Sequence, residues 1–430
     1  MVNPSTLAPD NSLLLDIEKK FVDASSAIES WFRLKWLEHA PPFYGSVDLR
    51  NSGFKLAPVD MNLFPGGFNN LSPAFLPLCA QAAVHAIERI CPNAKRLLLI
   101  PENHTRNLFY LQNVSTLVNL LKLTGLEVRI GSLLSEITAP TPFDLPDGNT
   151  LTLEPVIRDG ARIGLAGFEP CAILLNNDLS AGIPGILRDI EGQSVLPPLY
   201  AGWTVRRKSN HFIAYDEVAD EFSKLTGIDQ WLINPYFSVC SSVNFHERQG
   251  EECLAANVEA SLCMIREKYR EYGIGETPYV VVKADAGTYG MGVMTVKDVS
   301  GIVGLNRRQR NKMSVIKEGL NVTQVIIQEG VHTCERIGES SAEPVAYLID
   351  RFVVGGFYRV HDSRGVDENL NAPGMYFKPI AFETSCSFPD RNQTPNAPPN
   401  RFYTYGIIAR LAHLAAAIEL ERNKPLAEPS

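Results

Sequence analysis

One short segment constrains the fold of this chain more than any other: YVVVKADAGTYGMGV, residues 279–293. It is an apolar run that carries one lysine, Lys283, and continues into Gly287, Gly290 and Gly292. A lysine on an apolar strand is costly without a partner, and glycines let backbone N–H groups approach a phosphate. The pattern predicts a glycine flap between two strands, lying over phosphates, with Lys283 beside it.

The spacing of these glycines, G-x-x-G-x-G with strands on both sides, excludes two common nucleotide motifs. A Walker A loop requires G-x-x-x-x-G-K-[ST] before a helix, and no such string occurs in the chain. A Rossmann fingerprint also requires a helix directly after the glycines. A plain glycine-rich hairpin stays open as the alternative to a phosphate flap.

The segment TQVIIQEGVHTCE, residues 323–335, is a second apolar strand, and it runs into Gln328, Glu329 and then Val331. A strand that ends in such a hinge can offer backbone N–H and C=O groups to an adenine edge. A carboxylate a few residues further on, that of Glu335, can hold ribose hydroxyls. Lys283, the glycine flap and the hinge thus follow one another along the chain, and together they offer contacts for phosphates, adenine and ribose.

Strand and helix patterns alternate in the first half of the chain. An apolar strand at 96–105, a helix at 106–125 and a strand at 126–132 form one β-α-β unit, which requires a parallel sheet. A further strand at 170–178 ends in Asn176, Asn177 and Asp178, and such sheets bind ligands at the carboxyl ends of their strands. Residues 1–200 are therefore expected to form an α/β region with a parallel sheet.

The second half has a different pattern. Its strands are short and separated by turns, with one basic helix among them at 306–319, which favours an α+β region with antiparallel strands over 201–430. The strands are expected at 279–283, 293–296, 323–328, 346–354 and 357–361. Helical spacing predicts one long helix at 11–38 and further helices at 206–227, 254–273 and 402–422.

Residues 47–71 break the helical period and are rich in Gly, Pro and Asn. We expect a long loop there, and long loops in compact domains are usually functional. Its candidate side chains are Arg50, Asp60, Asn62 and Asn69, although Asn69 beside two glycines is also a natural turn residue.

Composition limits the class of protein. The net charge of −8 argues against a nucleic-acid binder that relies on a broad basic surface. The apolar runs are too short to cross a bilayer, and the start of the chain has no secretory pattern, so a cytoplasmic protein is expected. The eight cysteines show no C-x-x-C or zinc spacing and are expected to be reduced.

The order of Lys283, flap and hinge resembles the nucleotide site of the ATP-grasp superfamily, and VVVKADAGTYGMGV resembles its hallmark. The resemblance implies that ATP binds here and that an earlier lysine, Lys208 in RRKSNHF, also reaches the nucleotide. Residues 346–374 are similar to a stretch of glutathione synthetase and related ligases. That similarity implies that Arg359 and Arg364 bind phosphate or a substrate carboxylate, for which the planar guanidinium is suited.

The superfamily usually ends in a strand pair that supplies an acid and a Glu-x-Asn set to Mg²⁺, whereas this chain ends in an expected helix. Glu421-Arg422-Asn423 has that spacing, but at a helix end. The alternative oxygen set is Glu368, Asn369 and Asn371, because Mg²⁺ needs only one or two carboxylates besides phosphate and water.

The whole chain resembles the proteobacterial-type glutamate–cysteine ligases of glutathione biosynthesis. The resemblance lies in VDMNLFPGGFNNL (59–71), PENHTRN (101–107), LLNNDLS (174–180), GWTVRRKSNHF (202–212) and ENLNAPGMYFKP (368–379). It implies a pre-ATP-grasp-like parallel sheet followed by an ATP-grasp-like region, and ATP- and Mg²⁺-dependent joining of L-glutamate to L-cysteine through an acyl phosphate. The glutamate ligands implied are Arg50, Asp60, Asn62, Asn69 and Arg106.

Three alternatives stay open on the sequence. They are an ATP-grasp ligase with another substrate pair, a catalytically idle nucleotide-binding regulator, and a structural or interaction protein. The last alternative gives no function to Lys283 or to the glycine segment. The sequence indicates small-molecule partners, no nucleic acid and no membrane, and it leaves a homo-oligomer possible.

Overall fold

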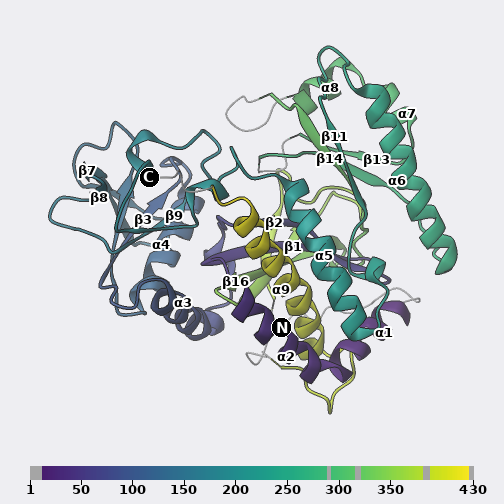
Figure 1. The fold of residues 1–430 in the computed structure, drawn as a ribbon, viewed down its shortest axis with the longest axis horizontal. Coiled ribbons are helices and arrows are strands. Elements are labelled where there is room, and N and C mark those ends of the chain that lie inside the picture. The colour runs from purple at the N-terminus through teal and green to yellow at the C-terminus, as the bar shows by residue number, and fades with distance from the viewer. Residues whose placement is uncertain (1–11, 288–291, 315–320, 381–387, 426–430) are drawn as a thin grey trace.

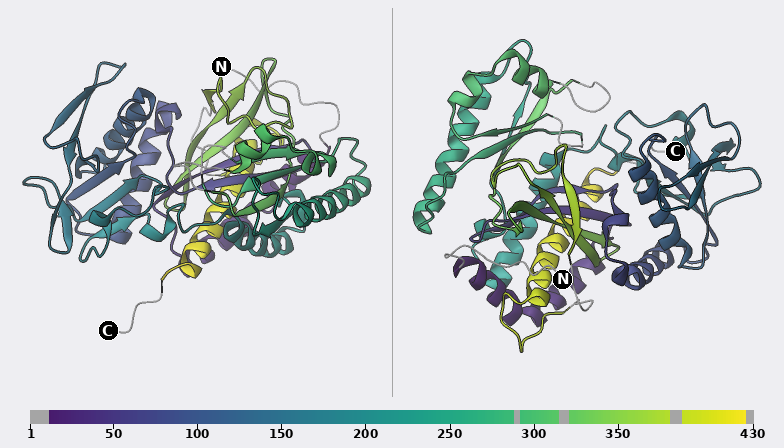
Figure 2. Two further views of the ribbon diagram at one scale, coloured as in Figure 1. Left: turned by 90° about the horizontal axis from the view of Figure 1, so that it is seen from above. Right: turned by 180° about the vertical axis from the view of Figure 1, so that it is seen from behind.

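The computed structural model describes residues 12–287, 292–314, 321–380 and 388–425. The described residues form three larger sheets, one two-stranded sheet and the helices that pack around them (Figure 1). A central antiparallel sheet, here called sheet A, lies between a parallel sheet B and a smaller antiparallel sheet C. Sheets B and C are at opposite ends of the long axis (Figure 2).

Sheet A joins strands from both ends of the chain. Its order is β18-β17-β16-β1-β2, with β15 also paired to β16, and all its pairs are antiparallel. The strands are β1 (Tyr44–Asn51), β2 (Leu56–Asn62), β15 (Arg336–Ile337), β16 (Ser340–Ile349), β17 (Phe352–His361) and β18 (Tyr376–Pro379). Because β1 pairs with β16, sheet A contains strands from both sides of the domain boundary expected near residue 200. That boundary stays a prediction.

Two sequence expectations in sheet A were wrong. Residues 47–71 are not one long loop, because β1 and β2 form a hairpin over residues 44–62. The strand pattern was missed because polar residues alternate with apolar ones along both strands. The expected strand at 346–354 spans the turn between β16 and β17. Asp350 lies in that turn with φ 51°, a left-handed conformation that Asp tolerates better than most residues.

Helices cover one face of sheet A. The long helix α9 (Pro398–Arg422) runs through the middle of the molecule beside α5 (Lys208–Thr226) (Figure 1). Helix α9 packs against β1, β2 and β16, and its small residues Ala412, Ala415 and Ala416 are fully buried. The expected helix at 11–38 is divided at Ala24 into α1 (Ser12–Asp23) and α2 (Ser25–Glu38), and the hydroxyls of Ser25 and Ser26 accept from Arg391.

Sheet B has the order β10-β9-β3-β4-β6-β5, and every pair is parallel except β5 with β6. The elements are α3 (Leu76–Ile90), β3 (Arg96–Pro101), α4 (Leu108–Lys122), β4 (Glu127–Ser132), β5 (Thr141–Asp144), β6 (Thr150–Pro155), β9 (Ala172–Asn176) and β10 (Ser194–Leu196). A small pair, β7 (Ile157–Asp159) and β8 (Arg162–Gly164), lies outside it. The expected β-α-β unit is confirmed as β3-α4-β4, and all of β9 is buried, as is usual in a parallel sheet.

Sheet C has the antiparallel order β11-β14-β12-β13. Its strands are β11 (Phe237–Ser241), β12 (Val280–Ala284), β13 (Val293–Val296) and β14 (Gln324–Glu329), with helices α6 (Glu251–Glu271), α7 (Ser300–Val303) and α8 (Arg307–Ser314). The glycine segment thus connects two antiparallel strands, as expected. None of the helices in the described part of the chain combines the length and apolarity needed to span a bilayer.

Candidate active site

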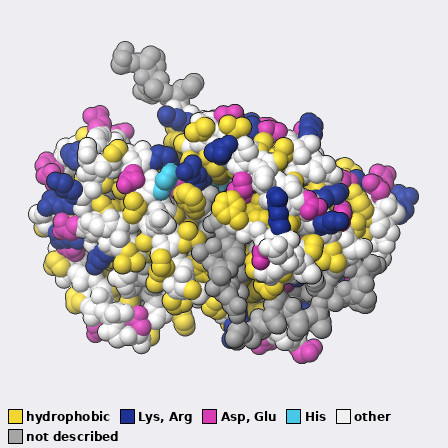
Figure 3. All heavy atoms as spheres, turned by 90° about the horizontal axis from the view of Figure 1, so that it is seen from below, with side chains coloured by type: hydrophobic (Ala, Val, Ile, Leu, Met, Phe, Trp, Pro, Cys, Tyr) yellow, Lys and Arg dark blue, Asp and Glu magenta, His cyan; other side chains and the backbone are white. Residues whose placement is uncertain are grey.

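A cavity of about 740 Å³ lies where sheets A, B and C meet. Its walls come from β1, β2, β16 and β17 of sheet A, from β12 and β14 of sheet C, and from the loops after β3 and β9 of sheet B. On the face of the molecule drawn in Figure 3, acidic and basic side chains are intermingled, without one broad basic patch. Positive charge is instead gathered inside the cavity, on Arg50, Lys208, Lys283 and Arg359.

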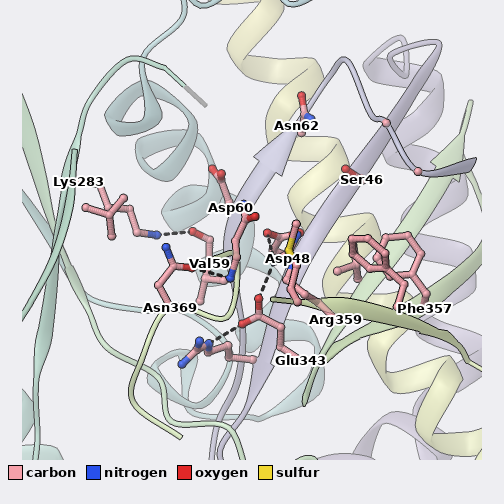
Figure 4. Close-up of a pocket in the computed structure, with 18 of the residues that line it drawn as sticks. Ser46, Asp48, Val59, Asp60, Asn62, Lys283, Glu343, Phe357, Arg359 and Asn369 are labelled. Carbon is pink, nitrogen blue, oxygen red and sulfur yellow. Dashed lines mark hydrogen bonds and ion pairs between the residues drawn. The ribbon is translucent and has the colours of Figure 1, made fainter. Parts of the chain in front are cut away.

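Lys283 reaches the cavity from the end of β12. Its Nζ donates to the carbonyl of Val59 at 2.7 Å (Figure 4). It also donates to Oε1 of Gln328 at 2.6 Å. Burial lowers the pKa of Lys283 to about 8, although the Asp60 carboxylate opposes the shift. Gln328 is 1% exposed, and its Nε2 has no hydrogen-bond partner among the described residues. The pair therefore offers an ammonium and an unused amide donor to an anionic ligand.

Lys208 and Asp60 form an ion pair at the cavity wall, with 2.7 Å between Nζ and Oδ1. Lys208 also lies over the Trp203 ring, 4.4 Å from its centroid. Burial opposes ionisation of Asp60, but the ammonium groups of Lys208 and Lys283 outweigh it and lower its pKa to about 2. Asp60 is therefore a carboxylate at any physiological pH.

A chain of four charged side chains crosses β1, β16 and β17. Arg359 donates to Asp48 at 2.8 Å and to Glu343 at 2.5 Å, and Glu343 accepts from Nε of Arg50 at 2.9 Å. Glu343 is buried and Asp48 is partly buried, and their pKa values shift in opposite directions. Burial raises the pKa of Asp48 despite Arg359, whereas for Glu343 the two guanidiniums outweigh burial and lower it. Nε of Arg359 has no partner within the described ranges and remains as a buried donor.

Arg50 has few donors left for a substrate. Besides Glu343, its guanidinium donates to the backbone carbonyls of Val331, Val366 and Glu368 at 3.3, 3.2 and 2.5 Å. The structure therefore places Arg50 as a clamp that holds the hinge after β14 and the loop after β17 on β1.

Two residues expected at the nucleotide point their carboxylates elsewhere. Glu329 accepts from Lys55 at 2.7 Å, from Trp231 Nε1 and from the backbone N–H of Tyr236 at 2.9 Å. Lys55 is fully buried. Glu329 and Val331 still contribute to the cavity wall at the hinge.

Glu335 lies away from the cavity. Its carboxylate accepts from Asn51 at 2.7 Å and from the hydroxyl of Tyr405 on α9. Residue Glu335 is 4% exposed and is absent from the cavity wall. This position gives no support to the expected ribose contact.

The flap is described only in part. Gly287 lines the cavity with φ 100°, and Gly292 has φ 60°; glycine adopts both conformations without strain. Gly290 lies outside the described residues. Asp285, between Lys283 and the flap, accepts from the N–H and hydroxyl of Ser209 at 2.8 and 2.7 Å and so fixes the start of α5 and Lys208.

The expected metal ligands lie on the loop between β17 and β18. Glu368, Asn369 and Asn371 line the cavity, but the Glu368 carboxylate accepts from Arg364 at 2.8 Å and from the Gly365 N–H at 2.7 Å. Oδ1 of Asn369 accepts from the N–H of Asn371 at 2.9 Å. Arg364 is exposed and does not line the cavity.

The other expected set, at the end of α9, is also engaged elsewhere. Glu421 bonds His39 at 2.8 Å, and Arg422 donates to Glu217 at 3.0 Å. Neither residue lines the cavity. Within the described ranges, no group of three or more His, Cys, Asp or Glu side chains is arranged to hold a metal.

Asn62 and Asn69 line the cavity as expected, whereas Arg106 is exposed and does not. At the carboxyl ends of β3 and β9, Asn176 accepts from Tyr110 at 3.0 Å and Asn113 at 3.3 Å and donates to the Pro65 carbonyl at 2.8 Å. The polar ends of those strands were anticipated.

Sequence reasoning missed several residues of the cavity wall, namely Asp48, Glu343, Glu102, Asn113 and Tyr347. The sequence contained a signal for Asp48. Ser46, Asp48 and Arg50 alternate along β1 and all reach the cavity, a period of two that indicates one face of a strand.

Comparisons with known proteins identify the family of this chain. The family profile of glutamate-cysteine ligase (GshA) matches residues 18–420. A crystal structure from Methylobacillus flagellatus KT, whose assignment as a gamma-glutamylcysteine synthetase is provisional, is 61% identical, with a TM-score of 0.92. The alignment covers 98% of this chain and 99% of that chain.

Two other solved structures are only distantly similar to this chain. The D-alanyl-alanine synthetase A of Vibrio cholerae O1 biovar eltor is 10% identical, with 74% of this chain and 81% of that chain covered and a TM-score of 0.33. A glutathione synthetase-like effector of Globodera pallida is 8% identical, with 82% and 78% covered and a TM-score of 0.35. None of the curated proteins compared with the chain gave a significant match. The profile match over residues 18–420 shows that the chain belongs to the glutamate-cysteine ligase family.

Proposed function

We propose that this ligase joins the γ-carboxylate of L-glutamate to the amine of L-cysteine with conversion of ATP to ADP and phosphate, the first step of glutathione biosynthesis. The γ-carboxylate attacks the γ-phosphate to give an acyl phosphate, and the cysteine amine then displaces phosphate. The observation that carries the proposal is that Lys283 and Gln328 of sheet C line the same cavity as Asp60 and Arg359 of sheet A. Catalysis by this chain is then positioning and charge neutralisation.

In this proposal residues 201–430 form an ATP-grasp-like region and bind the nucleotide. The hinge at Glu329–Val331 borders the adenine, and Gly287 and Gly292, the described glycines of the flap, border the phosphates. Lys283 exchanges its contacts with Val59 and Gln328 for phosphate oxygens, which an ammonium on a flexible stem can do. Lys55 acts indirectly, because it neutralises Glu329 and fixes the hinge strand.

The amino-acid side of the site comes mainly from residues 1–200, a pre-ATP-grasp-like region. Asn62 and Asn69 line the cavity beside the polar carboxyl ends of β3 and β9, so amide groups are available to an amino acid with two carboxylates and an ammonium. Arg359, with its unused buried Nε, is the guanidinium available to the transferring phosphoryl group or to the substrate carboxylate.

The residues present fit a Mg²⁺ ion at a different place from the one expected on the sequence. Asp48 and Asp60 are direct partners across the β1–β2 pair, and Asn62 follows on the same face. Two carboxylates and one amide oxygen suit Mg²⁺, which takes few protein ligands besides phosphate and water. A carboxylate has about four lone-pair sites, so the ion pairs with Arg359 and Lys208 leave capacity for a metal. When bound, Mg²⁺ supplies charge neutralisation for the triphosphate.

We therefore propose Asp48, Asp60 and Asn62 as its ligands in place of Glu368, Asn369 and Asn371. The proposal is supported by the engagement of Glu368 with Arg364 and Gly365. In this proposal the β1–β2 hairpin takes the role of the superfamily's final strand pair, because the last element that the structure describes is helix α9.

The decisive experiment measures ADP and phosphate release by the purified protein with ATP, Mg²⁺ and single amino acids, then pairs of amino acids. We expect release to require glutamate and to be fastest with glutamate and cysteine together, and to be lost in Lys283→Ala while the circular dichroism spectrum is unchanged. AMP as the product, or undiminished turnover in Lys283→Ala, would overturn the proposal. Preference for another pair would identify a related ligase, and nucleotide binding without turnover would identify a regulator.

A further inference from the structure

A pair of thiols lies in sheet C, outside the cavity. Sγ of Cys240 on β11 is 3.2 Å from Sγ of Cys253 in the first turn of α6. Cys240 is 1% exposed, whereas Cys253 is exposed to solvent. Neither the proposed mechanism nor the family assignment uses these residues.

The segment between the two cysteines holds them at this separation. The N–H groups of Asn244 and Gln249 donate to each other's carbonyls at 3.0 Å, and the N–H of Val243 donates to Thr323 at 2.9 Å. Gly250 starts α6 in the left-handed conformation with φ 79°. The turn and the helix therefore fix both backbones, and one side chain contacts both sulfurs: Nδ2 of Asn257 lies 3.3 Å from Cys240 Sγ and 3.4 Å from Cys253 Sγ.

We propose that Cys240 and Cys253 form a reversible intramolecular disulfide that fastens β11 to α6. A disulfide has a sulfur–sulfur bond of about 2.05 Å, so closure shortens the present gap by about 1.1 Å, a distance within reach of side-chain rotation. The oxidant class is a low-molecular-weight disulfide. One example is cystine, the disulfide of cysteine. Only the choice of cystine rests on the proposed function, in which cysteine is the amine substrate.

The exchange proceeds in two steps. The Cys253 thiolate, being exposed, attacks a sulfur of the small disulfide, forms a mixed disulfide and releases one small thiolate. Cys240 then attacks Sγ of Cys253 and displaces the second small thiolate. Two S–H bonds and the external S–S bond break, one protein S–S bond forms, and the two cysteine protons end on the two small thiols, which are the reduced product.

The disulfide would act on the sheet that carries Lys283. β11 pairs with β14, where Phe237 is the partner of Gln328, and β14 pairs with β12. A cross-link from β11 to α6 restricts the unfolded ensemble of this part of the chain and stabilises the sheet. We therefore expect the oxidised protein to unfold at a higher temperature than the reduced protein, with the difference removed by dithiothreitol.

The test equilibrates the full-length protein in buffers of reduced and oxidised glutathione, blocks remaining thiols by alkylation and measures intact mass and peptides. Trypsin cleaves after Lys224, Arg248 and Arg266, so Cys240 lies in peptide 225–248, and Cys253 and Cys263 lie together in peptide 249–266. We expect a loss of two alkylation sites and a cross-link between these two peptides. Cystine should give the same product.

Variants distinguish the partners. Cys253→Ser is expected to abolish the cross-link and the rise in Tm, whereas Cys263→Ser, an exposed cysteine of the same helix, is expected to leave both unchanged. A cross-link that survives in Cys253→Ser, or a stable glutathione adduct on Cys253 without closure, would overturn the inference. Oxidation confined to Cys91 and Cys171, a second pair of neighbouring thiols, would also overturn it. Ligase activity of the reduced protein is measured separately, so the two proposals fail independently.

Discussion

The buried ion pair of Lys55 and Glu329 provides a sharp test of how the hinge is held. Lys55 is 0% exposed and Glu329 2%, and their charged atoms are 2.7 Å apart. Lys55→Met fills the same volume but leaves the Glu329 carboxylate buried with neutral donors alone. Removing one partner of such a pair costs about 3–5 kcal/mol of unfolding free energy, a large part of the roughly 5–15 kcal/mol that stabilises a typical protein.

The assay is urea unfolding followed by tryptophan fluorescence, since Trp231 donates to Glu329 and reports on this site. The double variant Lys55→Met/Glu329→Gln buries no charge and should recover most of the loss, because an amide still accepts from Trp231 and Tyr236. The matched control is Lys224→Met, which removes the exposed i,i+4 pair with Asp220 and should cost about 0.5 kcal/mol or less.

The reasoning also predicts function. Lys55→Met should raise the KM for ATP more than it lowers kcat, because it displaces the hinge strand and leaves Lys283 in place. A loss below about 1 kcal/mol in Lys55→Met, or a double variant no more stable than the single one, would refute the assignment of Glu329 as a structural carboxylate. In that case the role of Glu329 as a direct nucleotide ligand would be favoured.

Three further predictions concern charge. Burial lowers the pKa of His413 to about 4, so as the pH falls below about 6.5 the unfolded state takes up the proton first and the free energy of unfolding decreases, by about 2 kcal/mol at pH 5. Urea unfolding at pH 7 and pH 5 should show a smaller pH dependence for His413→Leu. The control His246→Gln, at an exposed position, should keep the pH dependence of the parent protein. The pKa of Lys283 is lowered to about 8 in the free protein, so the Kd for ATP measured by calorimetry should rise above pH 8 as the ammonium loses its charge, and Lys283→Ala should lower kcat by about 10²–10³-fold and remove this dependence. Asp60→Asn should raise the Mg²⁺ concentration for half-maximal ADP release about tenfold or more, because the loss of one charged ligand costs about 1.5–3 kcal/mol. Glu368→Gln should change that concentration little. The reverse result would favour the loop after β17 as the metal site.

Local sequence patterns were sufficient for much of the fold. The β-α-β unit at β3-α4-β4 and the antiparallel strands around the glycine segment were predicted because their apolar periods are read from consecutive residues. Lys283 was found for the same reason, since a lysine on an apolar strand stands out from its immediate neighbours. Both it and Gln328 line the cavity.

The sequence by itself therefore predicted Lys283, the glycine segment and the strand that precedes the hinge, and it supplied the family resemblance from which the substrates are proposed. The tertiary structure alone decided which polar groups face one another. Asp48 and Glu343 both bond Arg359 because β1 pairs with β16 across almost three hundred positions, a contact whose energy depends on partners that no local window contains. For the same reason Glu335 and Glu329, acidic residues beside the hinge in sequence, direct their carboxylates to Tyr405 and Lys55, because buried charges follow the counter-charge and donors that packing supplies.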